Sequence, residues 1–177
     1  MVLSMNWLSD FVDCSDIDIK KYCDRMTDTG SKVEGYEILG EDIENVIVAR
    51  ILSIAPHENS DHLQICQVDI GGKTEQIVTG AQNIFEGAIV PAAIPVAKLP
   101  GNIVIKPGKL RGVVSNGMLC SMGELGLTEN DMPGSNNEGI FILNDYIENY
   151  NLGDDVRELL MLIDDCVEIE ITSNRPD

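Results

Sequence analysis

The chain has 177 residues, of which 44% are hydrophobic, and a mean hydropathy of zero, values that exclude a largely disordered protein. Its 30 acidic and 12 basic residues give a net charge of −18, which opposes nucleic-acid binding over most of the surface because phosphates need lysine and arginine. The most apolar stretch, residues 88–97, contains two prolines and is too short to span a membrane. The five cysteines are scattered without a CxxC pair, which favours a reducing cytoplasm over a disulfide framework or a zinc site.

Residues 1–39 are predicted to be mainly helical. Ser15 or Asp16 is expected to cap a helix, and Gly30 is expected to end it. Between them, apolar side chains recur at helical spacing and form one stripe: Ile19, Tyr22, Cys23 and Met26.

Residues 44–143 are predicted to form short strands separated by turns. Ser115-Asn116-Gly117 predicts a hairpin between the strands at 110–114 and 118–120. Many short strands with glycine and proline between them indicate a small closed β-barrel or a sandwich. The runs rich in β-formers are residues 46–52, 63–70, 74–78, 88–94, 103–105, 110–114, 118–120 and 139–143.

After Gly153 the pattern becomes helical again, and residues 167–171 then alternate as an edge strand does. Neither flank is long enough to bury a core alone, so we expect the two to pack on each other. The expected domains are a small discontinuous α+β domain, residues 1–39 plus 154–177, and a barrel inserted into it, residues 40–153. The stripe expected on the second flank consists of Val156, Leu159, Leu160 and Ile163.

Basic residues gather in one part of this acidic chain. Between Glu86 and Glu124 there is no acidic residue, and the 37 residues of this window carry +4 while the others carry −22. This window is the place where a polyanion would be tolerated, although a solvated barrel face is the alternative explanation. The basic residues are Lys98, Lys106, Lys109 and Arg111.

The same part of the chain lacks aromatic residues, since none occurs between Phe85 and Phe141. Barrels that hold single strands without sequence preference stack bases on aromatic rings. RNA contact here would therefore read backbone and shape, with Asn83, Ser115 and Asn116 as candidate hydrogen-bond partners.

No catalytic, cofactor or metal site is predicted within these residues. His57 and His62 lie in a polar loop without further ligands, which favours a structural loop. The sequence contains no GxSxG nucleophile elbow and no GxxxxGK[ST] phosphate loop.

Three runs within the expected barrel resemble the tRNA-binding domain of aminoacyl-tRNA synthetases and related proteins. They are residues 57–71 (HENSDHLQICQVDIG), 76–84 (QIVTGAQNI) and 109–127 (KLRGVVSNGMLCSMGELGL). Both flanks, residues 4–8 and 27–35 on one side and 168–177 on the other, are similar to the bacterial phenylalanyl-tRNA synthetase beta subunit family. The family resemblance covers nearly the whole chain.

The resemblance implies a fold that is mainly β, with an OB-fold barrel inserted into a small discontinuous α+β domain. It also implies a non-catalytic, tRNA-contacting and architectural module of a longer cytoplasmic ligase. That ligase joins phenylalanine to its tRNA with ATP and magnesium, as a tetramer of two alpha and two beta subunits, and no membrane or DNA partner is expected. The alternatives are a free-standing tRNA-binding protein, an appendage of another synthetase, and a purely structural or protein-interaction domain.

Overall fold

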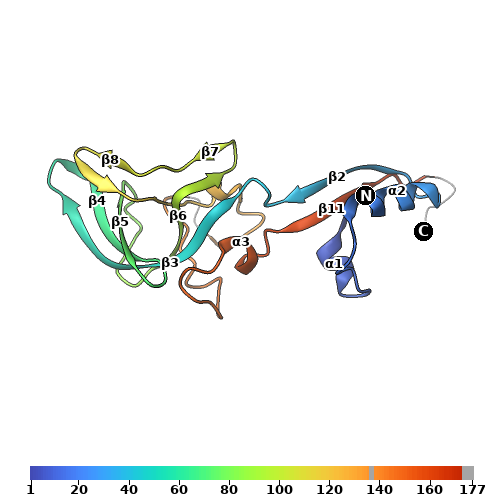
Figure 1. Ribbon diagram of the computed structural model, residues 1–177. Helices are drawn as coiled ribbons and strands as arrows, with labels where there is room; N and C mark the ends of the chain where they lie inside the picture. The colour runs from blue at the N-terminus through green and yellow to red at the C-terminus, as the bar shows by residue number, and fades with distance from the viewer. Residues whose placement is uncertain (136–137, 173–177) are drawn as a thin grey trace. The chain divides into compact units, whose positions relative to one another are not determined.

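The computed structural model describes residues 1–135 and 138–172, in which the chain forms two compact units (Figure 1). One unit combines residues 1–41 with the chain from residue 161 onward, and the other consists of Asp42–Leu160. The predicted motif residues from 173 to 177 lie outside the described part of the chain.

The larger unit is an antiparallel β structure. Its main sheet has the order β10-β6-β3-β4-β5, with β7 paired to β6, and β8 and β9 form a hairpin of their own (Figure 1). The strands are β3 (Glu44–His57), β4 (Ser60–Asp69), β5 (Thr74–Thr79), β6 (Ile89–Leu99), β7 (Ile103–Val104), β8 (Gly108–Leu110), β9 (Val113–Ser115) and β10 (Met118–Leu119).

The two ends of this sheet meet at a closure that we call the seam, where β5 lies against residues 113–116. The backbone N–H of Asn116 donates to the Gln76 carbonyl at 2.8 Å, and the Gln76 side chain donates to the Val114 carbonyl at 2.7 Å. Because the next residues, β10, pair with β6 at the other end of the sheet, the sheet closes into a barrel. The predicted mainly β fold with an OB-type barrel is therefore confirmed.

Aliphatic side chains fill the barrel interior. They come from β3, β4, β5, β6 and β10, and each fully buried one stabilises the fold by roughly 1.5–3 kcal/mol. Fully buried members include Ala49, Ile51, Cys66, Val68, Ile77 and Val90.

The hairpin predicted at Ser115-Asn116-Gly117 is wrong. The tight turn lies instead at Arg111-Gly112, where Leu110 pairs with Val113 and the two turn residues have φ of 46° and 94°. Gly117 has φ of 141°, and a Cβ there would lie 2.6 Å from the Ala93 carbonyl oxygen. Glycine at this position therefore lets the two backbones approach closely, where the chain leaves β5 and β8 and joins β6.

Residues 139–143, predicted as a strand, form no strand, although Ile140, Phe141 and Leu143 are buried. The Phe141 N–H donates to the Cys120 carbonyl at 3.0 Å, and the Leu143 N–H donates to the Ile89 carbonyl at 2.8 Å. The amide of Asn83 holds the backbone of Ile140. The segment bonds to three different places in turn, so no continuous ladder with one neighbour can form.

Residues 154–160 belong to the barrel unit and not to the flank, which moves the predicted boundary. Val48 accepts from the Gly153 N–H at 2.8 Å and donates to the Asp154 carbonyl at 2.9 Å. These bonds fix α3 (Val156–Leu159) beside β3, and Val156 is fully buried there. The predicted stripe is thus divided, because only Ile163 lies in the smaller unit.

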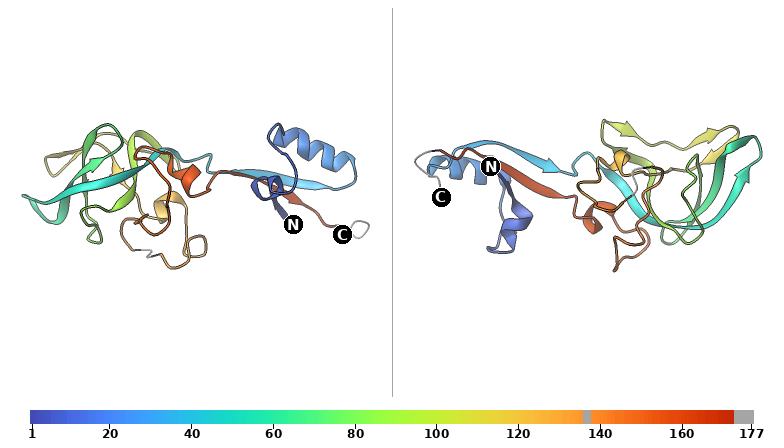
Figure 2. Two further views of the ribbon diagram at one scale, coloured as in Figure 1. Left: turned by 90° about the horizontal axis from the view of Figure 1, so that it is seen from below. Right: turned by 180° about the vertical axis from the view of Figure 1, so that it is seen from behind.

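The smaller unit is a three-stranded antiparallel sheet with the order β1-β11-β2, and Figure 2 shows α2 along β2. Its core contains Met5, Cys23, Val167 and Ile169. The alternating strand predicted at an edge is the central strand of this sheet, because it pairs with a neighbour on each side. Its residues alternate because one face of the sheet packs on the core and the other meets solvent. The elements are β1 (Val2–Ser4), α1 (Met5–Ser9), α2 (Ile19–Asp28), β2 (Val33–Leu39) and β11 (Asp164–Ile169).

The cap of α2 differs from the predicted Ser15 or Asp16. Asp18 is the N-cap, and its carboxylate accepts from the Lys21 N–H at 2.9 Å. Asp has the short acceptor that this position favours, so the helix begins at Ile19.

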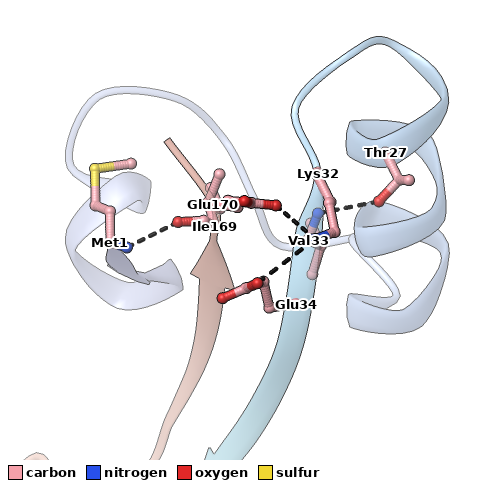
Figure 3. A network of polar contacts seen from close by, with 7 residues as sticks. All are labelled: Met1, Thr27, Lys32, Val33, Glu34, Ile169 and Glu170. Atoms are coloured by element: carbon pink, nitrogen blue, oxygen red, sulfur yellow. Dashed lines mark hydrogen bonds and ion pairs between the residues drawn. The ribbon is translucent and has the colours of Figure 1, made fainter. Parts of the chain in front are cut away.

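Polar contacts join β2 to the end of β11 in the smaller unit (Figure 3). The Lys32 ammonium lies 2.5 Å from the Glu170 carboxylate and 3.6 Å from that of Glu34. The N-terminal amine donates to the Ile169 carbonyl at 2.7 Å. The Lys32 and Glu170 side chains are 58% and 42% exposed, so their ion pair adds little stability and mainly fixes the register of the strands.

Candidate functional site

The basic residues of the acid-free window lie mostly on one exposed segment, residues 103–112, which we call the arm. It comprises β7, β8 and the turn at Arg111-Gly112. Lys106, Lys109 and Arg111 are exposed, and within residues 1–135 and 138–172 no carboxylate forms an ion pair with them. The arm therefore presents three positive charges to solvent.

Contacts with the β3–β4 hairpin hold the arm in place. The Arg111 guanidinium donates from Nη1 to the Asn59 carbonyl at 3.2 Å. His57, only 4% exposed, accepts from the Asn59 N–H at Nδ1, so its Nε2 carries the proton and donates to the Leu110 carbonyl at 3.1 Å. His57 thus ties the arm to this hairpin; it is the last residue of β3 and His62 lies in β4, so the two histidines do not share the polar loop that the sequence predicted.

Lys98, the fourth basic candidate, lies on β6 away from the arm. Its ammonium is 2.6 Å from the Glu44 carboxylate across the β3–β6 pair, and the two side chains are 51% and 44% exposed. The neighbouring carboxylate offsets this charge, so Lys98 offers less attraction to a polyanion than the arm does.

The three polar candidates are engaged by the fold. Asn83 accepts from the Ile140 N–H at 3.0 Å and donates to the Ile140 carbonyl at 2.8 Å. The buried Ser115 hydroxyl accepts from the Val78 N–H and donates to the Gly117 carbonyl. Asn116 donates to the Glu75 carboxylate at 2.9 Å. Their role in RNA contact stays a prediction, while their contacts show what each does for the barrel.

A cavity of about 580 Å³ lies beside the arm, and the sequence reasoning missed it. Lys106, Gly108 and Leu110 of the arm form one side. Residues 79–81, at the end of β5, and the residues Ser121 and Glu124 form others. The available signal was Glu124, the carboxylate that ends the acid-free window and whose side chain reaches the same cavity as Lys106.

The buried cysteines of the barrel are poor nucleophiles. Burial raises the pKa of the Cys66 thiol to about 11 and, with the Glu124 carboxylate as a smaller cause, that of Cys120 to about 12. Both thiols are protonated at neutral pH, and a protonated thiol does not attack carbonyl or phosphoryl groups.

Among residues 1–135 and 138–172, no three or more His, Cys, Asp or Glu side chains are grouped so as to hold a metal ion. Over the same ranges, no helix is both long enough and apolar enough to cross a membrane.

Residues 46–143 match the sequence family described as "Putative tRNA binding domain". Over its whole length the chain is 48% identical to the phenylalanine–tRNA ligase beta subunit of Clostridium acetobutylicum. The identities to the corresponding subunits of Oceanobacillus iheyensis and Clostridium tetani are 41% and 44%. The chain spans 21–22% of the length of these relatives. The resemblance drawn from the motifs is thereby confirmed.

Proposed function

The chain belongs to the tRNA-binding domain family, and on that premise we propose that its barrel binds tRNA through Lys106, Lys109 and Arg111 of the arm. The observation that carries the proposal is the exposure of these three cations, none of which is paired with a carboxylate among residues 1–135 and 138–172, on a molecule of net charge −18. Repulsion elsewhere on the surface leaves the arm as the most favourable place for a phosphate backbone.

The mode of binding follows from what the arm carries. It presents lysine and arginine side chains but no aromatic ring for stacking, so it contacts phosphates rather than bases. Such binding is sensitive to salt and tolerant of sequence, and it suits an accessory contact that positions a tRNA held elsewhere.

The similarity to phenylalanine–tRNA ligase beta subunits supports a wider assignment. We propose that the whole protein is a cytoplasmic ligase that joins phenylalanine to its tRNA with ATP and magnesium. We also propose that it assembles with an alpha subunit. In this proposal the present residues contain no catalytic group and serve to contact tRNA and to shape the assembly. The match over the full chain favours this over a free-standing tRNA-binding protein.

Salt-dependent tRNA binding tests the role of the arm. If all three cations contact phosphates, log affinity should fall against log salt with a slope between about −2 and −3. The triple variant Lys106→Ala, Lys109→Ala, Arg111→Ala should lose most of this affinity in a fluorescence titration with labelled tRNA. The matched control is Lys20→Ala, Lys21→Ala, Arg25→Ala on α2, which removes the same charge from the smaller unit.

Equal loss in both triple variants would show that only net charge matters. Salt-independent binding, or none at low ionic strength, would favour the rival structural role. One observation supports that rival: Ile103 and Val104, at the start of the arm, are 52% and 48% exposed, as they would be on a protein-binding surface.

A further inference from the structure

Four glycines line the cavity beside the arm, and only two of them are explained by the fold. Gly117 and Gly139 have positive φ and lie where a Cβ would collide with Ala93 and Asn83. Gly80 and Gly108 have no positive φ, and a Cβ on either would meet no heavy atom closer than 3.8 Å. Neither backbone conformation nor crowding calls for glycine at these two positions. A bare backbone there keeps the cavity open to a ligand that approaches closely.

The cavity is also lined by two oppositely charged residues, each of which keeps a hydrogen-bonding group available to a ligand. One oxygen of Glu124, Oε2, accepts from the Ser121 N–H at 2.6 Å and from its hydroxyl at 2.8 Å, as in a capping box. The other oxygen, Oε1, forms no hydrogen bond within the described residues, and neither does the Lys106 ammonium. The cavity thus offers one cationic donor and one anionic acceptor.

We propose that this cavity binds a single unstacked ribonucleotide of the bound RNA. Its phosphate pairs with Lys106, a ribose hydroxyl donates to Glu124 Oε1, and its base packs on Leu110, Met118 and Ile140. The proposal deepens the tRNA-binding function proposed above and rests on it. It adds a subsite that distinguishes RNA from DNA.

The chemistry of the lining favours this ligand over simpler ones. A free inorganic anion would be repelled by Glu124, and an apolar ligand would leave both charges without partners. A ribonucleotide carries an anion and hydroxyl donors together, and its size suits a cavity of about 580 Å³.

Mononucleotides test the subsite without tRNA. In NMR titrations of the whole chain, adenosine 5′-monophosphate should shift the amide signals of Gly80, Gly108 and Ser121. The 2′-deoxy compound, which lacks the donating hydroxyl, and adenosine, which lacks the phosphate, should each bind about tenfold more weakly. Equal affinity for the ribo and deoxy compounds, or no shift of these amides at about 10 mM nucleotide, would overturn the proposal.

Two variants assign the interactions. Glu124→Gln keeps an oxygen for Ser121, since glutamine also serves in capping boxes, but it replaces the charged acceptor, so the preference for ribose should disappear. Gly108→Val should fill the cavity and abolish nucleotide binding without loss of stability, because valine suits an open strand position. Gly35→Val on β2, where a Cβ also meets nothing within 4 Å, is the matched control and should bind normally.

The tRNA titration separates this subsite from the function of the arm. If the arm variant loses tRNA while Gly108→Val binds tRNA and nucleotide normally, the subsite is disproved and the arm function stands. If Gly108→Val abolishes nucleotide binding while the double variant Lys109→Ala, Arg111→Ala, which leaves Lys106 in the subsite, retains full tRNA affinity, the arm function fails instead.

Discussion

The arm and the seam lie on the same barrel and come from neighbouring stretches of sequence, yet their polar residues have different partners. On the arm, Lys106, which lines the cavity, and Lys109 are exposed and have no carboxylate partner among the described residues. At the seam and beside it, Ser115, Asn116 and Asn83 form hydrogen bonds with the backbone and side chains of the barrel itself.

The difference arises from the hydrogen-bond partners that are available to the backbone N–H and C=O groups in each region. The seam joins segments that do not form a full ladder, so buried N–H and C=O groups need side chains to satisfy them. The arm is exposed, and water satisfies its backbone. A short polar residue near a sheet closure therefore indicates a role in stability. A long cationic side chain on an exposed hairpin indicates a role in binding.

The largest effect should come from Gly117→Ala at the seam. The new Cβ would meet the Ala93 carbonyl at 2.6 Å, and alanine rarely adopts φ of 141°, so we expect a loss of about 3 kcal/mol or more. Denaturant unfolding measures it. Gly35→Ala, in open space, should change stability by less than about 1 kcal/mol. Similar values for the two variants would contradict the close approach at the seam.

Asn83→Ala should cost about 2 kcal/mol, because it leaves the N–H and C=O of the buried Ile140 without their partners. Asn83→Asp keeps the acceptor for the N–H and should lose about half as much. Thermal and denaturant unfolding provide the values, and tRNA affinity gives the second reading. A variant that folds stably but loses tRNA would mean that Asn83 acts at the RNA interface and not in holding the barrel together.

Alkaline pH should weaken the barrel through its buried thiols. Burial raises the pKa of Cys66 to about 11 and of Cys120 to about 12 from a usual 9.0, so the unfolded chain ionises first. Stability is then fully present below pH 9 and falls as pH rises toward the folded values, by about 1 kcal/mol per thiol at pH 10. The Cys66→Ala, Cys120→Ala double variant should show a flatter decline in denaturant unfolding. An unchanged decline would exclude these thiols as its cause.

The smallest effect concerns Lys98, which Glu44 holds in an ion pair. Glu44→Gln should release this cation and steepen the salt dependence of tRNA binding by at most about 0.7–0.9 in slope. Glu129→Gln removes the same charge elsewhere on the barrel unit and controls for net charge. A steeper slope in both variants would show that the ion pair itself does not matter.

Local patterns were enough to predict the main barrel strands and the cationic window, but not β1 and β2, which lie in a stretch predicted to be helical, nor the pairing of distant segments. The runs at 46–52 and 74–78 lie within β3 and β5, and the run at 63–70 passes the end of β4 by one residue, because β-branched alternation is a local property. The seam joins Gln76 to Asn116, and nothing near Asn116 in the sequence shows that its N–H bonds to β5 and not across a hairpin. The cavity likewise gathers residues from 79 to 140, so only the closed barrel reveals it.

The ion pair of Lys98 escaped prediction for a related reason. Glu44 stands far outside the acid-free window, and counting charges along the chain cannot show that the β3–β6 pairing places it opposite Lys98. Among the basic candidates, those on the arm remain without a carboxylate partner in the described residues, because the groups that hydrogen-bond to the arm are the Asn59 carbonyl and the His57 ring.

If the arm binds tRNA as proposed, the left-handed turn at Arg111 makes stability and recognition compete for one position. Arginine at φ of 46° costs the hairpin up to about 1 kcal/mol relative to glycine or asparagine, which suit such turns. A library enriched only for heat resistance should discard this arginine, whereas one enriched for capture of tRNA should retain it. The residue that each enrichment retains at this position would show whether the arm serves stability or tRNA binding, and no binding constant would have to be measured.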